Sequence, residues 1–110
     1  MNKKLANQPR ELGIDLGGSK IEAVLLDQAG EMVWRERVAT PAQDYLAILQ
    51  AIQQLTQQAE AVAGHSLAVG IGTPGAISTR SGLLRNSNTV CLNGQNLYLD
   101  LQQLLQRPLR

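Results

Sequence analysis

The sequence predicts an α/β fold with a mixed sheet and helices on its faces, in the element order β-β-β-α-β-α. Three observations favour it. Short aliphatic runs alternate with sharp turns over residues 11–39, a long amphipathic helical pattern follows, and a continuous apolar run occupies residues 67–72. Because the chain has 110 residues, we expect one small domain with a modest core.

The first three strands are predicted at 11–16, 20–27 and 31–39. Each run is rich in β-branched and aliphatic residues. Gly17 and Gly18 form the first turn, and residues 28–30 form the second, since Gly and polar residues cluster there. Local hairpins should therefore join these strands into an antiparallel meander.

A helix is predicted to follow, with Thr40 as its N-cap, Pro41 in its first position and Gly64 as its stop. The apolar stripe of this helix comprises Tyr45, Ile48, Leu49, Ile52, Leu55, Thr56, Ala59 and Val62. Glutamines fill the opposite side, so we interpret them as a solvated helix face rather than as low-complexity sequence.

Leu67–Gly72 is predicted to be an interior strand, buried on both sides and parallel to the first strand. A second helix is indicated by leucines at 97, 101, 104 and 105, before Pro108. The stretch between them is rich in Gly, Ser, Asn and Thr, and a ligand could bind there.

Composition narrows the class of protein. A net charge of +1 gives no broad basic field, so we expect no nucleic-acid partner. No apolar run is long enough to span a bilayer, and no membrane partner is expected. We expect residues 1–10 to be a disordered tail on a cytoplasmic protein.

His65, Cys91 and Trp34 are each read as turn or packing residues, because none has a second reactive group nearby in the sequence.

The clearest chemical signal lies in residues 15–20, where a carboxylate and two glycines meet at a turn between antiparallel strands. Glycine lets backbone N–H groups approach a phosphate, while Ser19 adds a hydroxyl donor and Lys20 a positive charge. Asp15 beside phosphates implies an intervening Mg²⁺, held through water. An ordinary tight turn without a ligand could have the same sequence pattern. The pattern is neither a Walker A loop nor a dinucleotide-binding fingerprint, which both lie between a strand and a helix.

The segment Leu12–Lys20 resembles the first phosphate motif of the actin, hexokinase and heat-shock-protein superfamily, and within it the ROK family of repressors and sugar kinases. A second block, Gly70–Ile77, resembles the Gly-x-Gly-x-Pro-Gly segment of that family. A third, Arg85–Gly94, resembles the sugar loop of its bacterial fructokinases. The resemblance runs from about Glu11 to the last residue and implies a ribonuclease H-like (actin-like ATPase) fold, here truncated.

The resemblance also implies roles for individual residues. It assigns the binding of the ATP phosphates and their Mg²⁺ to Asp15, Gly17, Gly18, Ser19 and Lys20. It assigns the binding of the sugar to the backbone of Gly75 and Ala76 and to the carboxamide of Asn88. Asn86, Thr89 and Asn93 are weaker candidates for the same pocket. Without the flanking blocks, these residues would be read as turn formers in a surface loop.

By resemblance, residues 11–110 form the N-terminal phosphate- and sugar-binding lobe of a kinase that phosphorylates the 6-hydroxyl of fructose. The general-base Asp, the adenosine-binding lobe and a cysteine-rich zinc site would lie beyond Arg110, so we expect this polypeptide alone to be inactive. Three alternatives remain: a sugar-sensing domain of a repressor, a glucose or N-acetylhexosamine kinase, and a non-catalytic relative of actin. An open sheet edge makes a homo-oligomer the expected state.

Overall fold

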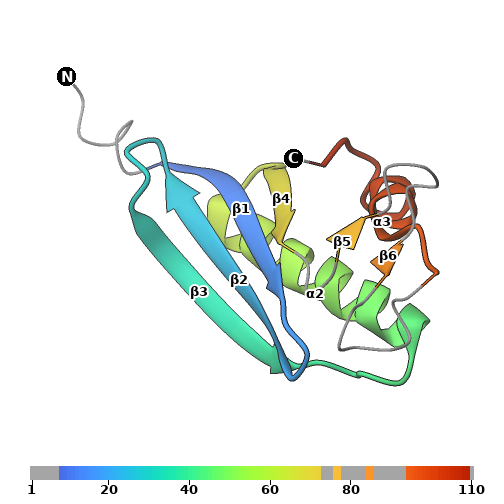
Figure 1. The fold of residues 1–110 in the computed structure, drawn as a ribbon. Coiled ribbons are helices and arrows are strands. Elements are labelled where there is room, and N and C mark those ends of the chain that lie inside the picture. Colours follow the sequence, from blue (N-terminus) through green and yellow to red (C-terminus); the bar gives the residue numbers. More distant parts are fainter. Residues whose placement is uncertain (1–7, 73–75, 78–83, 86–93, 110) are drawn as a thin grey trace.

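The structure, a computed structural model, describes residues 8–72, 76–77, 84–85 and 94–109. Its elements are β1 (Pro9–Leu16), β2 (Lys20–Asp27), β3 (Met32–Ala39), α2 (Tyr45–Ala63), β4 (Ala68–Gly72), β5 (Ala76–Ile77), β6 (Leu84–Arg85) and α3 (Leu97–Leu105). The four long strands form one sheet in the spatial order β3-β2-β1-β4, and α2 and α3 lie beside it (Figure 1). The predicted α/β fold and order of elements are confirmed.

The sheet is mixed, as predicted. β1 pairs antiparallel with β2 and parallel with β4, so that Leu12 lies opposite both Leu25 and Val69. Successive side chains of a strand point to opposite faces, and one face of β1 buries Leu12, Ile14 and Leu16. These leucine and isoleucine side chains join those of β2, β4 and both helices in one core.

The first strand begins at Pro9 rather than at Glu11, so the last two residues of the expected tail belong to β1. Pro9 pairs with Asp27, and the register shifts between Pro9 and Glu11. Proline lacks a backbone N–H and is tolerated at the first residue of a strand. The apolar pattern starts only at Leu12, and it therefore gave no signal for these residues.

The predicted start of the long helix was wrong. Asp44 is the N-cap of α2, and its carboxylate accepts a hydrogen bond of 3.1 Å from the backbone N–H of Ala47. Thr40 lies outside the helix, where its hydroxyl has another partner. The predicted stop is confirmed, because Gly64 caps α2 in the left-handed conformation with φ of 80°.

The apolar stripe of α2 packs into the core along most of the helix, and its buried members are Ile48, Leu49, Ile52, Leu55, Thr56 and Ala59. Val62 is the exception, since 53% of its surface is exposed. In the last turn the stripe continues from Ala59 to Ala63, four residues on, and Ala63 packs against the core. Most of the glutamines are exposed, as expected of a solvated face.

The second helix is confirmed, with Leu97, Leu101 and Leu105 buried. In the stretch predicted as a loop, β5 and β6 form a short antiparallel ladder. Leu109 makes an isolated parallel bridge to Val69, on the side of β4 away from β1. Among the described residues, neither helix is both long and apolar enough to cross a membrane.

Candidate functional site

The turn between β1 and β2 is closed by a hydrogen bond of 2.9 Å from the backbone N–H of Gly17 to the carbonyl oxygen of Lys20. A Cβ atom at Gly17 would lie only 2.8 Å from that same oxygen, closer than real Cβ atoms approach a carbonyl. Glycine is thus required at this position by the close return of the Lys20 backbone. The requirement does not come from a left-handed φ.

Thr40 holds two further carbonyl groups of this turn. Its backbone N–H donates to the carbonyl oxygen of Ser19, and its hydroxyl donates to that of Gly17, both at 2.9 Å. The end of β3 reaches the turn because Ala39 is paired with Lys20 in the sheet. No sequence pattern indicated this contact, since Thr40 was read as a helix cap.

The donors of the turn have no such partners. Within the part of the chain that the structure describes, no carbonyl or side chain accepts from the backbone N–H of Gly18 or Ser19. Lys20 is exposed and makes no ion pair with another described residue. Three carbonyl acceptors are therefore occupied while two N–H donors, a hydroxyl and an ammonium group are available. This arrangement can bind an anion.

Asp15 lies in β1 just before the turn, in register with Glu22 on one side and Gly72 on the other. It is exposed, and its carboxylate has no hydrogen-bond partner or ion pair among the described residues. No cluster of three or more metal-ligating side chains occurs in those residues. A lone unpaired carboxylate fits a Mg²⁺ ion that keeps its waters and takes its other ligands from phosphates.

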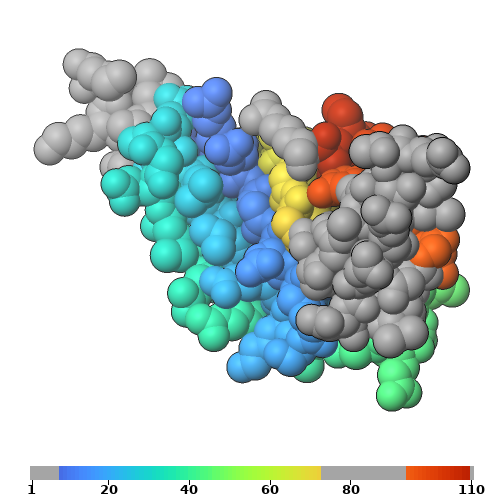
Figure 2. Space-filling model, viewed as in Figure 1, coloured from blue at the N-terminus to red at the C-terminus, as the bar shows by residue number. Residues whose placement is uncertain are grey.

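A trough of 530 Å³ adjoins Asp15 on the face of the sheet opposite the buried leucines. Its floor contains Gly13 and Gly70, which are direct partners across β1 and β4, and Gly72, the partner of Asp15. Glycines leave this floor without side chains. The residues that line the trough belong to β1, β2 and β4, and Figure 2 shows that atoms of these three strands are exposed at the surface. Residues 17–20 do not line the trough, so the turn and the trough meet at Asp15.

Two carboxylates line the trough, but they differ in charge environment. Glu22 is within 3.4 Å of Arg35 and 3.3 Å of Arg37 on β3, and both arginines are about half exposed. Surface pairs of this kind contribute little to stability, yet they neutralise Glu22 locally. Within the described parts of the chain, Asp15 is thus the carboxylate of the trough without a cation paired to it.

The structure describes little of the predicted sugar site. Gly75 and Asn88 lie outside the described residues, as do the weaker candidates Asn86, Thr89 and Asn93. The backbone of Ala76 lies in β5, opposite Arg85 of β6. Cys91 is also outside the described part, whereas His65 is exposed at the end of α2, as expected.

Tyr98 connects α3 to the neighbourhood of the trough. Its hydroxyl donates to the carbonyl oxygen of Ile71 at 3.0 Å, next to Gly72. A second tyrosine, Tyr45 of α2, donates to Asp100 of α3 at 2.5 Å. The pKa of Tyr45 is raised well above its ordinary value by burial, and further by the hydrogen bond and negative charge of Asp100.

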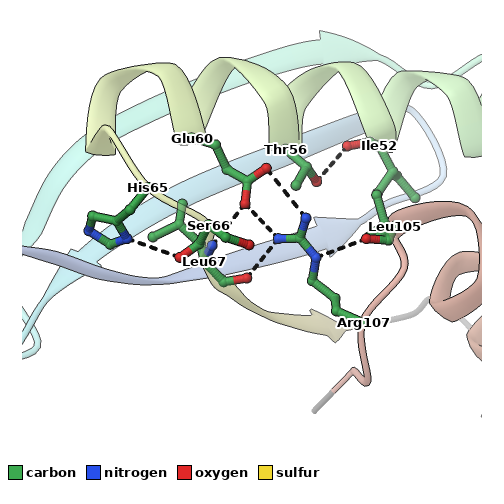
Figure 3. Close-up of polar contacts among 8 residues, drawn as sticks. All are labelled: Ile52, Thr56, Glu60, His65, Ser66, Leu67, Leu105 and Arg107. Atoms are coloured by element: carbon green, nitrogen blue, oxygen red, sulfur yellow. Dashed lines mark hydrogen bonds and ion pairs between the residues drawn. The ribbon is translucent and has the colours of Figure 1, made fainter.

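A separate polar cluster joins the ends of α2 and α3 to the start of β4 (Figure 3). Arg107 donates to Glu60 at 2.6 Å and to the carbonyl oxygen of Leu67 at 2.7 Å, while Glu60 also accepts from the N–H of Leu67. Burial raises the pKa of Glu60, but the hydrogen bonds and charge of Arg107, with the Leu67 N–H, outweigh it and hold the pKa below its ordinary value. This cluster is remote from the turn and stabilises the fold.

Known proteins resemble the chain over most of its length. The N-acetyl-D-glucosamine kinase of Yersinia pseudotuberculosis serotype O:3 is 39% identical over 98 residues, which cover 89% of this chain and 32% of that protein. The N-acetyl-D-glucosamine kinase of Erwinia tasmaniensis is 40% identical over 98 residues and is covered to the same extent. The chain therefore spans about a third of the length of these curated relatives.

A solved structure agrees with these relatives. The ROK family glucokinase of Streptomyces griseus, solved with glucose and AMPPNP, superposes with a TM-score of 0.76 at 28% identity, over 90% of this chain and 31% of that one. These chains share the order of strands and helices described above. The model of the ROK family itself matches residues 11–110, and the chain belongs to this family.

Proposed function

We propose that this chain is the phosphate-binding N-terminal lobe of an ATP-dependent sugar kinase. One observation carries the proposal: three of the four carbonyl groups of residues 17–20 accept from Thr40 or Gly17, whereas the N–H groups of Gly18 and Ser19 have no partner among the described residues. The kinases among the relatives support the same activity, since they phosphorylate sugars according to their names.

In this proposal the residues of the turn bind the phosphates of ATP. The N–H groups of Gly18 and Ser19 and the Ser19 hydroxyl donate to phosphate oxygens, and Lys20 supplies positive charge. Gly17 allows the turn to close. Asp15 holds Mg²⁺ through water, and the ion would offset the charge of the phosphates. Phosphoryl transfer depends mainly on such positioning and charge stabilisation.

N-acetyl-D-glucosamine is the first candidate for the sugar, because the curated relatives described above are named for it. The preference for fructose inferred from residues 92–94 finds no support among them, and we keep fructose as the second candidate. Gly75, Ala76 and Asn88 are proposed to contact the sugar. Because the chain spans about a third of these relatives, turnover is proposed for the product of the complete reading frame.

A sugar-sensing role in a transcriptional regulator is the alternative. A ROK family transcriptional regulator, a homologue of the E. coli MLC protein, superposes with a TM-score of 0.71 at 18% identity, over 94% of this chain and 27% of that one. At that identity the likeness concerns the fold alone. The donors of the turn and the Asp15 carboxylate have no partner among the described residues, and this favours the kinase.

The experiment is a coupled assay of ADP release by the product of the complete reading frame, with N-acetyl-D-glucosamine, fructose, glucose and N-acetyl-D-mannosamine as acceptors. Lys20→Met should raise the KM for ATP at least about tenfold, since a charge-assisted contact contributes about 1.5–3 kcal/mol. Arg10→Met is the matched control, because Arg10 is also an exposed cation of the same hairpin but lies at the opposite end of β1. Sugar-independent activity, or equal effects of the two variants, would contradict the proposal.

A further inference from the structure

We propose that Thr40 is a positioning residue that fixes the conformation in which the β1–β2 turn presents its N–H groups to phosphate. The proposal rests on the proposed kinase function and adds a residue outside the turn itself. Thr40 follows β3 and lies 23 residues from Gly17 in the sequence. It is half-buried, and its contacts to the turn are all with backbone carbonyls.

The two bonds of Thr40 reach carbonyl groups on either side of Gly18. The hydroxyl donates to Gly17, and the backbone N–H donates to Ser19, each at 2.9 Å. A third carbonyl, that of Lys20, accepts from the N–H of Gly17. The pairing of Ala39 with Lys20 holds the end of β3 against the turn, so both bonds of Thr40 are made from a fixed strand.

These bonds decide which end of each peptide dipole is available to a ligand. A carbonyl oxygen repels phosphate, whereas an N–H group attracts it. A turn of two flexible residues can rotate a peptide unit and exchange the two. The Gly17 carbonyl shares a peptide unit with the Gly18 N–H, and the Ser19 carbonyl shares one with the Lys20 N–H, so rotation of either unit costs a hydrogen bond to Thr40. The Gly18 N–H therefore stays opposite a bonded carbonyl and available to a ligand, and the peptide unit that carries the Ser19 N–H lies between two fixed units.

Pro41 prepares Thr40 for this role. The residue before a proline is restricted to extended backbone, because the proline ring clashes with helical conformations there. Pro41 also carries no N–H that could compete for the turn carbonyls. The helix begins only after Asp44, which leaves Thr40 free of the helical hydrogen-bond pattern.

The test uses three variants of the product of the complete reading frame. Thr40→Val keeps the shape of the side chain but removes its hydroxyl, and we expect it to raise the KM for ATP about fivefold, the equivalent of one neutral hydrogen bond. The KM for the sugar should stay within about twofold. Thr40→Ser restores the hydroxyl and should return the KM for ATP to within about twofold of the wild-type value.

Thr56→Val is the matched control. Thr56 is buried in α2, away from the turn, and its hydroxyl donates to the carbonyl oxygen of Ile52 at 2.8 Å. The same chemical change there should lower thermal stability without altering the KM for ATP. The inference is overturned if Thr40→Val leaves the KM for ATP unchanged, raises both KM values equally, or is not rescued by Thr40→Ser.

A second measurement separates this inference from the proposed function. Hydrogen exchange of the Gly17 amide reports the bond that closes the turn, and it needs no turnover. Thr40→Val should accelerate that exchange about fivefold and Thr56→Val should not. A wild-type protein without kinase activity would refute the function while this exchange still tests Thr40. An active wild type with unchanged exchange in Thr40→Val would refute the inference alone.

Discussion

Replacement of Gly17 by alanine should open the β1–β2 turn. The added Cβ would lie 2.8 Å from the carbonyl oxygen of Lys20, whereas ordinary contacts of this kind begin near 3.4 Å. That oxygen belongs to the backbone and is held by the N–H of Gly17 itself at 2.9 Å. It cannot move away as the end of a flexible side chain could, so the hydrogen bond must lengthen or break.

The cost has two parts. Loss of the bond between Gly17 and Lys20 contributes about 0.5–1.5 kcal/mol, and residual strain in the turn adds about 1–3 kcal/mol. We therefore expect the free energy of unfolding to fall by about 1.5–4.5 kcal/mol. For a small domain this is a large share of the total stability, and it should appear as a lower urea midpoint with an unchanged slope.

Urea titration of the chain, followed by circular dichroism, measures this change against a matched variant. Gly13→Ala adds the same methyl group within β1, four residues before Gly17, and the nearest atom to it is the carbonyl oxygen of Val24 at an ordinary 4.0 Å. We expect Gly13→Ala to change stability by less than about 1 kcal/mol. If both variants lose the same stability, the close approach at Gly17 is not what requires glycine there.

Three further substitutions test other parts of the fold. Asp27→Ala should lower the free energy of unfolding by about 1–3 kcal/mol, because the buried carboxylate accepts two backbone N–H bonds of 2.9 Å in the next turn; Asp27→Asn should cost less, and urea titration measures both. The lowered pKa of Glu60 means that its ion pair stabilises the fold above its ordinary pKa of 4.5 and is lost as pH falls through the lower, folded value. Arg107→Met should thus cost about 1–2 kcal/mol near neutral pH and less at about pH 3 in the same titration, and an equal cost at both would contradict this. Ultraviolet titration of the phenols should show one tyrosine whose pKa lies above the ordinary value of 10, and this step should disappear in Tyr45→Phe. If the step persists in Tyr45→Phe, the interaction of Asp100 with the Tyr45 hydroxyl is not its cause.

The four long strands and the second helix could be predicted because their signals are local, whereas β5 and β6, of two residues each, were not predicted. Alternating apolar residues and glycine turns marked β2 and β3 within a residue of their observed bounds, and the leucine spacing marked α3. The start of α2 could not be chosen in the same way. Thr40 and Asp44 are both good N-caps by residue type, and the choice depends on where the end of β3 meets the β1–β2 turn.

The candidate site was predictable only in part. Asp15 to Lys20 stood out because a carboxylate, glycines and a cation adjoin one another in the sequence. The contribution of Thr40 depends on β3 folding back beside this segment, so no local pattern could reveal it. The glycine floor of the trough likewise depends on the register of β1 with β4, which pairs Gly13 with Gly70. The proposed sugar contacts Gly75 and Asn88 remain predictions.

The contact of Arg107 with Glu60 and Leu67 has a consequence for the order of folding. It joins positions 47 and 40 residues apart, whereas β1, β2 and β3 are connected by hairpins of neighbouring residues. Loop closure over such distances follows the formation of local contacts. We therefore expect the ion pair to form after the rate-limiting step. In stopped-flow experiments Arg107→Met should accelerate unfolding and leave the refolding rate nearly unchanged. This contact would then lengthen the lifetime of the folded state without speeding its formation.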